Sequence, residues 1–142
     1  MTMAAELHHV GIVVTDLEAA MAEMTALFGI EWTAPQERPD RDRTLRVAFS
    51  TSKPRIELIQ GNEGGVWATE GGPRIDHLAF WTDTAATEAI GTGHGATKEA
   101  GGQAAWGGKW AYLRLPATGA RVELCDAAGQ ERFRNTWGFD TP

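Results

Sequence analysis

The sequence predicts an α+β fold of two tandem βαβββ modules, whose strands form one cupped half-barrel sheet with the helices outside. Two observations predict it. The stretch around His9 is repeated 68 residues later around His77, and the stretch around Glu57 is repeated 66 residues later around Glu123. Two matches in the same order and at nearly the same offset are hard to obtain by chance, so an internal repeat determines the expected fold.

The matched stretches have the composition of β-strands. HHVGIVVTD (residues 8–16) aligns with DHLAFWTDT (residues 76–84), and both are β-rich runs that end in Thr and Asp. LRVAFSTSKPRIELIQ (residues 45–60) aligns with AYLRLPATGARVELCD (residues 111–126). Each copy is typical of a strand, a turn that contains Pro or Gly, and a second strand. In both copies the second strand holds a Glu between an apolar residue and Leu.

The repeat also predicts the organisation of the chain. We expect modules at about residues 6–60 and 74–126, a Gly-rich linker at residues 61–73 and a C-terminal tail at residues 127–142. Residues 31–44 and 98–110 leave room for one further strand in each module. Neither module alone would bury a sheet face, so the whole chain, residues 1–142, is predicted to be a single domain.

A helix is expected after the first strand of each module. Thr15 begins a Thr-x-x-Glu pattern, which is typical of a helix N-terminus, and apolar residues then recur at helical spacing until Gly29. In the second module, Asp83 or Thr84 would cap a shorter helix over residues 85–90. The glycines that follow are poor helix formers, so we expect them to end this helix.

Composition excludes several classes of protein. The chain has 142 residues, of which 42% are apolar and 23% charged, as in ordinary globular domains. A formal net charge of −6 disfavours nucleic-acid partners, which bind basic faces. No apolar run approaches the roughly 20 residues that a membrane span needs, and the N-terminus lacks the pattern of a secretion signal. Cys125 is the only cysteine, which fits a reducing, cytoplasmic location.

Four residues of the repeat form a candidate metal site. Because side chains alternate along a strand, a cup-shaped sheet would bring two imidazoles and two carboxylates together. Such a set suits a divalent cation with open coordination positions, and Zn, Ni, Co, Mn and Fe are all compatible. The predicted ligands are His9, Glu57, His77 and Glu123. If the glutamates faced solvent the site would not exist, but their recurrence in register favours the metal.

The register of the first strand decides between two adjacent histidines. A slip of one residue would exchange the faces of His8 and His9. The repeat aligns His8 with Asp76 and His9 with His77, so His9 is the expected ligand.

Four segments carry a resemblance to a known family. LHHVGIVVTDLEAAM, RIELIQ, IDHLAFWTD and ARVELCD resemble the vicinal oxygen chelate superfamily, which contains glyoxalases, bleomycin-resistance proteins and extradiol dioxygenases. The resemblance covers about residues 6–126. The order His, Glu, His, Glu is similar to the metal set of the glyoxalase I and methylmalonyl-CoA epimerase branch. It implies that Glu123 and, on the other face of the substrate, Glu57 also transfer protons.

The resemblance implies a metal-dependent isomerase, epimerase or lyase that acts on a carbonyl-bearing small molecule through an enolate intermediate. Polarisation of the carbonyl by the metal makes the neighbouring carbon more acidic, and a carboxylate removes its proton. Two alternatives remain open. One is a metal-free binding protein of the bleomycin-resistance type. The other is an Fe(II) extradiol-type dioxygenase with His9, His77 and Glu123 as its facial triad.

Aromatic residues indicate the kind of substrate and partner. The chain has six Trp and one Tyr. Aromatic side chains that line a pocket favour a bulky or aromatic small molecule as the ligand. The residues expected to bind it are Trp81, Trp110, Tyr112 and the linker residue Trp67. The tail, with Phe133 among its aromatic residues, is expected to pack across the domain or across a partner subunit, and we expect a homodimer.

Overall fold

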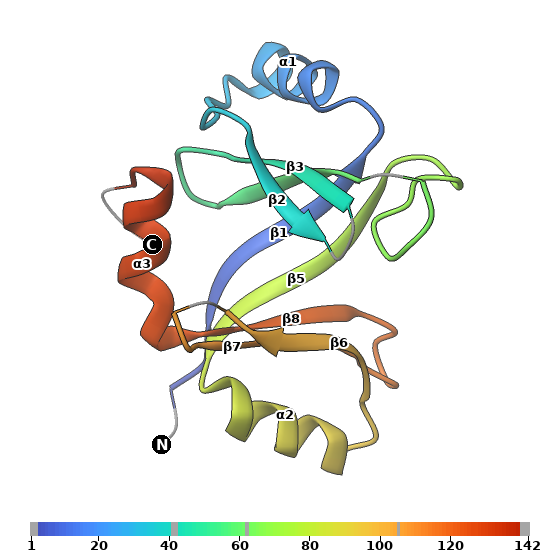
Figure 1. Ribbon diagram of the computed structural model, residues 1–142, viewed down its shortest axis with the longest axis vertical. Coiled ribbons are helices and arrows are strands. Elements are labelled where there is room, and N and C mark those ends of the chain that lie inside the picture. Colours follow the sequence, from blue (N-terminus) through green and yellow to red (C-terminus); the bar gives the residue numbers. More distant parts are fainter. Residues whose placement is uncertain (1–2, 41–42, 62, 105, 140–142) are drawn as a thin grey trace. The chain divides into compact units, whose positions relative to one another are not determined.

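The computed structural model describes residues 3–40, 43–61, 63–104 and 106–139. Its elements follow the chain in the order β1 (Glu6–Val14), α1 (Leu17–Phe28), β2 (Gln36–Asp40), β3 (Arg43–Phe49), β4 (Ile56–Gln60), β5 (Arg74–Thr82), α2 (Thr84–Gly93), β6 (Thr97–Gln103), β7 (Lys109–Arg114), β8 (Arg121–Asp126), a short 3-10 turn (Ala127–Gly129) and α3 (Gln130–Trp137) (Figure 1). The chain divides into a first unit, His9–Asp76, and a second unit, Met1–His8 with His77–Pro142. The strands β1 and β5 therefore contribute residues to both units.

The first unit is a mixed sheet covered by one helix. Its strands are ordered β2-β3-β4-β1. The two outer pairings are antiparallel, and β4 and β1 are parallel. The helix α1 packs against β3 and β4 (Figure 1). The core on this side consists of Val14, Leu17, Ala48 and Leu58, with Met21 and Met24 of α1 against it.

The start of α1 differs by one residue from the predicted cap. Asp16 is the N-cap, since its side chain accepts a hydrogen bond from the amide of Ala19 at 2.9 Å. The prediction of Thr15 was therefore wrong, because Asp16 has the extended backbone and the short acceptor that a cap requires. The predicted end is confirmed: Gly29 is the C-cap in the left-handed conformation, with φ of 68°.

The second unit repeats the arrangement with a different helix. Its strands are ordered β5-β8-β7-β6, with β5 and β8 parallel and the other pairs antiparallel. Asp83 caps α2, as predicted. The helix continues through Gly91 and ends at Gly93, so the expected end at residue 90 was wrong, although the helix still ends among the glycines. A Cβ at Gly91 would lie 2.9 Å from the Leu113 side chain, so close packing on the sheet outweighs the low helix propensity.

The C-terminal tail folds back onto its own unit. Phe133 of α3 contacts His8 edge-on, with ring centroids 4.4 Å apart, and lies 5.7 Å from the Trp81 ring. Phe139 packs on Phe133 at 5.6 Å. Packing of the tail within the domain is therefore observed.

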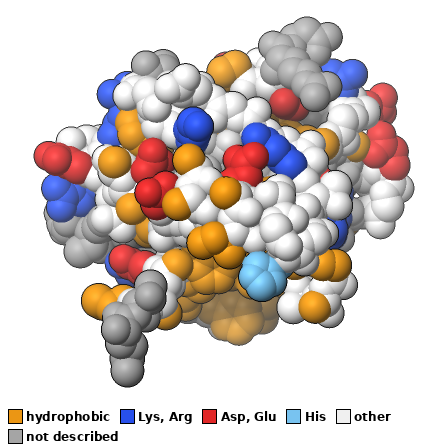
Figure 2. Space-filling view, turned by 90° about the horizontal axis from the view of Figure 1, so that it is seen from below, with side chains coloured by type: hydrophobic (Ala, Val, Ile, Leu, Met, Phe, Trp, Pro, Cys, Tyr) orange, Lys and Arg blue, Asp and Glu red, His pale blue; other side chains and the backbone are white. Residues whose placement is uncertain are grey.

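Both units share the element order strand, helix and three strands, which confirms the predicted α+β class and the two tandem βαβββ modules. Among the described residues, no helix has the length and apolar character needed to cross a membrane. On the face in Figure 2, Lys and Arg side chains lie beside Asp and Glu side chains, with apolar groups between them. Charges of both signs are thus mixed on this face, where a nucleic-acid surface would be basic.

Candidate metal centre

A histidine and a glutamate lie side by side in the first unit. His9 belongs to β1 and Glu57 to the parallel strand β4, where Glu57 pairs in register with Gly11. The imidazole Nε2 is 3.5 Å from a carboxylate oxygen of Glu57. His9 is only 2% exposed, so this imidazole is fixed by its surroundings.

The second unit holds an equivalent pair. His77 belongs to β5 and Glu123 to the parallel strand β8, where Glu123 pairs with Ala79. In both units the glutamate is thus in register with the residue two positions after the histidine. The Nε2 of His77 is 3.3 Å from a carboxylate oxygen of Glu123, and His77 is also buried. The sequence repeat therefore corresponds to a repeated geometry.

The distances within the pairs indicate what they could bind. Charge-assisted N–H···O hydrogen bonds are usually about 2.7–2.9 Å long, and both pairs are wider than that, at 3.5 and 3.3 Å. Two ligands of one ion, each at about 2.1 Å, are separated by about 3.0–3.4 Å for right-angled to tetrahedral geometry. The spacing of both pairs is close to that of two ligands of a common cation. A nitrogen and a carboxylate oxygen also form a suitable donor set for a divalent transition metal.

An aromatic ring orients each histidine. Phe49 lies opposite Glu57 in the β3–β4 pairing, and its ring meets His9 edge-on at 5.4 Å. Tyr112 lies opposite Glu123 in the β7–β8 pairing, and its ring meets His77 edge-on at 5.2 Å. Tyr112, one of the residues predicted to bind substrate, therefore lies beside the second His–Glu pair. The two units differ here by a single hydroxyl group.

A buried arginine precedes each glutamate by two residues, a feature that the sequence analysis missed. Arg55 is 3% exposed and Arg121 is 5% exposed. The Nη1 of Arg55 donates to the Ser50 carbonyl at 2.9 Å. Burial lowers the pKa of Arg55, but a guanidinium remains charged in proteins. The signal was present in the sequence as Arg-x-Glu-Leu in both copies.

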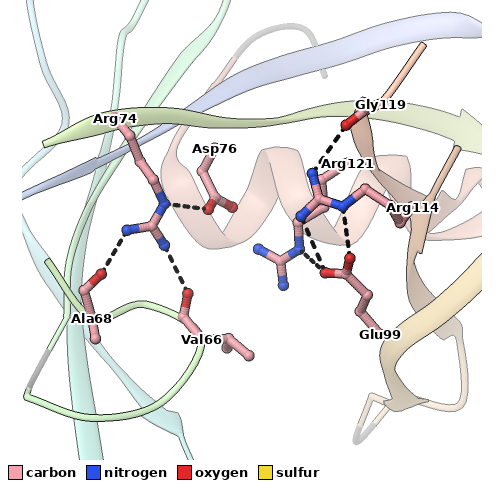
Figure 3. A network of polar contacts seen from close by, with 8 residues as sticks. All are labelled: Val66, Ala68, Arg74, Asp76, Glu99, Arg114, Gly119 and Arg121. Carbon is pink, nitrogen blue, oxygen red and sulfur yellow. Dashed lines mark hydrogen bonds and ion pairs between the residues drawn. The ribbon is translucent and has the colours of Figure 1, made fainter. Parts of the chain in front are cut away.

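The second arginine belongs to a small charged network. The Nε of Arg121 is 3.1 Å from Glu99, and its guanidinium lies 4.3 Å from the centroid of the Tyr112 ring. Arg114, on the neighbouring strand, binds the same Glu99 at 2.7 Å (Figure 3). Arg121 is thus adjacent to the ring that contacts His77.

The other histidine of the first strand lies in a different environment. His8 stacks on Trp81 with ring centroids 4.0 Å apart and an angle of 11° between the ring planes. The structure therefore brings His9, and not His8, to Glu57. Trp81, which was predicted to bind substrate, is 7% exposed and contacts both His8 and Phe133.

The remaining predicted substrate residues differ in exposure. Trp110 is 37% exposed and contacts Tyr112 edge-on at 6.1 Å. Trp67 is 9% exposed, and a Cβ on Gly61 would overlap its backbone carbonyl. The linker is thus folded closely upon itself.

An arginine holds the linker in place. Arg74 donates to the carbonyls of Ala68 at 2.6 Å and Val66 at 2.8 Å, and its Nε is 3.1 Å from Asp76 (Figure 3). Asp76 directly precedes His77. The linker and the strand that carries the second histidine are therefore tied to one side chain.

Comparison with protein families identifies the class. Residues 8–112 match the model of the Glyoxalase/Bleomycin resistance protein/Dioxygenase superfamily. The chain belongs to this superfamily, as its sequence resemblance implied. No curated protein matches the sequence.

Solved structures share the fold at low sequence identity. Methylmalonyl-CoA epimerase from Mycobacterium tuberculosis is 24% identical, with a TM-score of 0.67 over 89% of this chain and 92% of that one. A Streptomyces coelicolor methylmalonyl-CoA epimerase variant in complex with 2-nitronate-propionyl-CoA is 20% identical, with a TM-score of 0.67 over 89% and 99%. A hypothetical protein from Bacillus halodurans C-125 is 21% identical, with a TM-score of 0.69 over 87% and 95%. At these identities the likeness concerns the fold.

Proposed function

We propose that the two His–Glu pairs bind one divalent metal ion together and that the protein is a metal-dependent isomerase, epimerase or lyase. The observation that carries the proposal is the equivalent spacing of 3.5 and 3.3 Å in the two pairs. Each of the four side chains offers one ligand atom. Two nitrogen and two oxygen ligands leave positions on a six-coordinate ion for two substrate oxygens.

The chemistry follows from the residues of the two pairs. A divalent ion supplies Lewis-acid polarisation of a substrate carbonyl, which acidifies the adjacent carbon. The carboxylates of Glu123 and Glu57 are the bases, one for each face of the substrate, that accept this proton and return it. Phe49 and Tyr112 pack edge-on against the imidazoles and help to hold their orientation. The same proton transfer serves isomerisation, epimerisation and glyoxalase-type lyase chemistry.

The relatives of known structure support this class of reaction. Two are epimerases, and the one from Streptomyces coelicolor is described in complex with 2-nitronate-propionyl-CoA. They support a carbonyl-bearing small molecule as substrate. The exposed ring of Trp110 beside Tyr112 supports an aromatic or bulky group on it. We propose further that the protein acts as a cytoplasmic homodimer, in keeping with its single cysteine.

Metal content measured by mass spectrometry on protein purified without an affinity tag tests the proposal. We expect about one divalent ion per chain in the wild type and loss of the ion in His77→Ala and Glu123→Ala, because removal of a ligand weakens binding more than the roughly 10–100-fold loss seen for outer partners. The identity of the ion separates an iron dioxygenase from an isomerase or lyase.

The control is the fourth histidine. His94 is exposed at the end of α2, so His94→Ala should retain the ion. A wild-type protein that contains no metal and takes up none on titration would contradict the proposal and leave a binding protein as the remaining function.

A further inference from the structure

One face of the second unit carries a series of contacts that ends at His77. The strands β5, β7 and β8 each contribute a residue to the core that faces α2, namely Phe80, Leu113 and Val122. Side chains alternate along a strand, so His77, Tyr112 and Arg121 lie on the opposite face of this unit. On that face one aromatic ring contacts both a cation and a histidine.

Arg121 reaches the Tyr112 ring from the neighbouring strand. Tyr112 is opposite Glu123 in the β7–β8 pairing, so Arg121 is its diagonal neighbour, within reach of a long side chain. The guanidinium carbon lies 4.3 Å from the ring centroid, which is inside the range of about 6 Å over which a cation is attracted to an aromatic face. Both residues are buried, so water competes little with this contact.

A bulge in β6 provides the anchor for this arginine. The β6–β7 register shifts between Lys98 and Ala100, so Glu99 is the extra residue of the bulge. Bulges re-aim a side chain relative to a regular strand. The Glu99 carboxylate is 3.1 Å from the Nε of Arg121 and 2.7 Å from the Nε of Arg114 (Figure 3). An irregularity of the strand thus fixes the position of the guanidinium.

The ring in turn meets the histidine. The Tyr112 and His77 centroids are 5.2 Å apart, with an angle of 87° between the ring planes. The imidazole Nε2 is 3.3 Å from a carboxylate oxygen of Glu123, so a rotation of the imidazole would change the spacing of this pair. A ring that is held by a cation turns less freely, and the imidazole that packs against it is restricted as well.

We propose that Arg121 is a positioning residue, which acts through the Tyr112 ring to hold the His77 imidazole in its metal-binding orientation. This inference rests on the proposed metal site and adds a residue that supports it. Glu99 belongs to the same series of contacts because it anchors Arg121. Support of the ligand therefore begins at a carboxylate on β6, the last strand in the order of the sheet.

The visible absorption spectrum of bound Co²⁺ tests the proposal, because its bands depend on the arrangement of the ligands. Spectra are recorded at saturating Co²⁺, so differences in affinity do not contribute. We expect a changed spectrum in Arg121→Met. Arg121→Lys should restore the wild-type spectrum, since a lysine is also attracted to an aromatic face. Glu99→Gln should shift the spectrum in the same direction as Arg121→Met, and it should fold, because the Glu99 side chain is 29% exposed.

A double-mutant cycle separates positioning from a direct effect of charge. Loss of a nearby cation favours a bound metal ion by itself, and this contribution cancels in the cycle because it is present with and without the ring. Co²⁺ titration of Arg121→Met, Tyr112→Leu and the double variant supplies the cycle. We expect Arg121→Met to weaken Co²⁺ binding by about threefold or more relative to its effect in the Tyr112→Leu background.

Arg114→Gln is the matched control, because Arg114 binds the same Glu99 but its side chain is 46% exposed. It should retain the wild-type Co²⁺ spectrum. A purely structural role for Arg121 would lower the free energy of unfolding without changing the coordination of Co²⁺. A wild-type spectrum in Arg121→Met and Glu99→Gln, an equal change in Arg121→Lys, or additive effects in the cycle would overturn the inference while the metal site stands. Failure of the wild type to take up Co²⁺ would instead remove the metal site and the inference with it.

Discussion

The first and second units place the same kinds of side chain at equivalent positions but surround them differently. His9, Glu57 and Phe49 in one unit correspond to His77, Glu123 and Tyr112 in the other, with ring distances of 5.4 and 5.2 Å to the histidines. The donor atoms are thus duplicated, whereas the second unit adds a phenol hydroxyl. The repeat explains why each unit holds an equivalent His–Glu pair, and Phe49 and Tyr112 are a position at which the surroundings of the two pairs differ.

The arginines show the same contrast. Arg55 donates to a backbone carbonyl, which carries no net charge. Arg121 binds Glu99, which also holds Arg114. The charge of Arg121 is therefore partly offset by the carboxylate of Glu99, and Arg55 holds the segment that follows β3 through the Ser50 carbonyl. The repeat thus keeps an arginine at both positions, but the groups that each arginine binds differ.

Truncation of a leucine in either of the two helix-facing cores is expected to have the largest effect on stability. Leu58 is fully buried and has Met21 and Met24 of α1 against its cluster. Leu124 is 3% exposed in a cluster with Ala111, Leu113 and Val122. Truncation of a buried leucine to alanine costs about 2–5 kcal/mol, and the cost depends on how far the site can collapse. Methionine is flexible and fills gaps, so Leu124→Ala should cost more than Leu58→Ala.

Urea unfolding of both variants measures this difference. Leu27→Ala is the control, because Leu27 is 68% exposed on α1 and should change the free energy of unfolding by less than about 0.5 kcal/mol. A larger loss for Leu58→Ala would show that the methionines do not relax into the cavity and would remove the proposed difference between the two cores.

The repeat made much of this comparison predictable, because it fixes both the order of the elements and the register of residues on parallel strands. His9 and Glu57 could be paired from sequence for that reason. Arg55 and Arg121 recur at the same offset as the glutamates. An arginine near a strand usually reaches solvent, and only the folded structure shows that these two are buried. The continuation of α2 through Gly91 depended on a tertiary contact with Leu113, which local propensity does not contain.

A smaller effect is expected at the first residue of the second helix. Leu17 and Thr84 begin α1 and α2, and both are buried. The Thr84 hydroxyl has no hydrogen-bond partner among the described residues. A buried polar group without a partner costs about 1–3 kcal/mol, so Thr84→Val should raise the free energy of unfolding by about 1 kcal/mol. Chemical denaturation measures the change.

Thr92→Val is the matched control for this substitution. The Thr92 hydroxyl is exposed and donates to the Glu88 carbonyl at 3.0 Å, so its removal should give no gain in stability. If Thr84→Val proved destabilising, the hydroxyl would have a partner, such as a bound water. The first residue of α2 would then carry no unsatisfied polar group, like the first residue of α1.

The smallest effect is expected at the equivalent positions Phe49 and Tyr112, which differ by one hydroxyl group. Tyr112→Phe gives the second unit the aromatic ring of the first, and the edge-on contact with His77 at 5.2 Å depends on the ring alone. Metal affinity should therefore stay within about threefold of the wild type, which is less than 1 kcal/mol. Titration with Co²⁺ measures it. A large loss would show that the hydroxyl supports the ligand set, and the two pairs would then be equivalent in geometry but not in the way they are held.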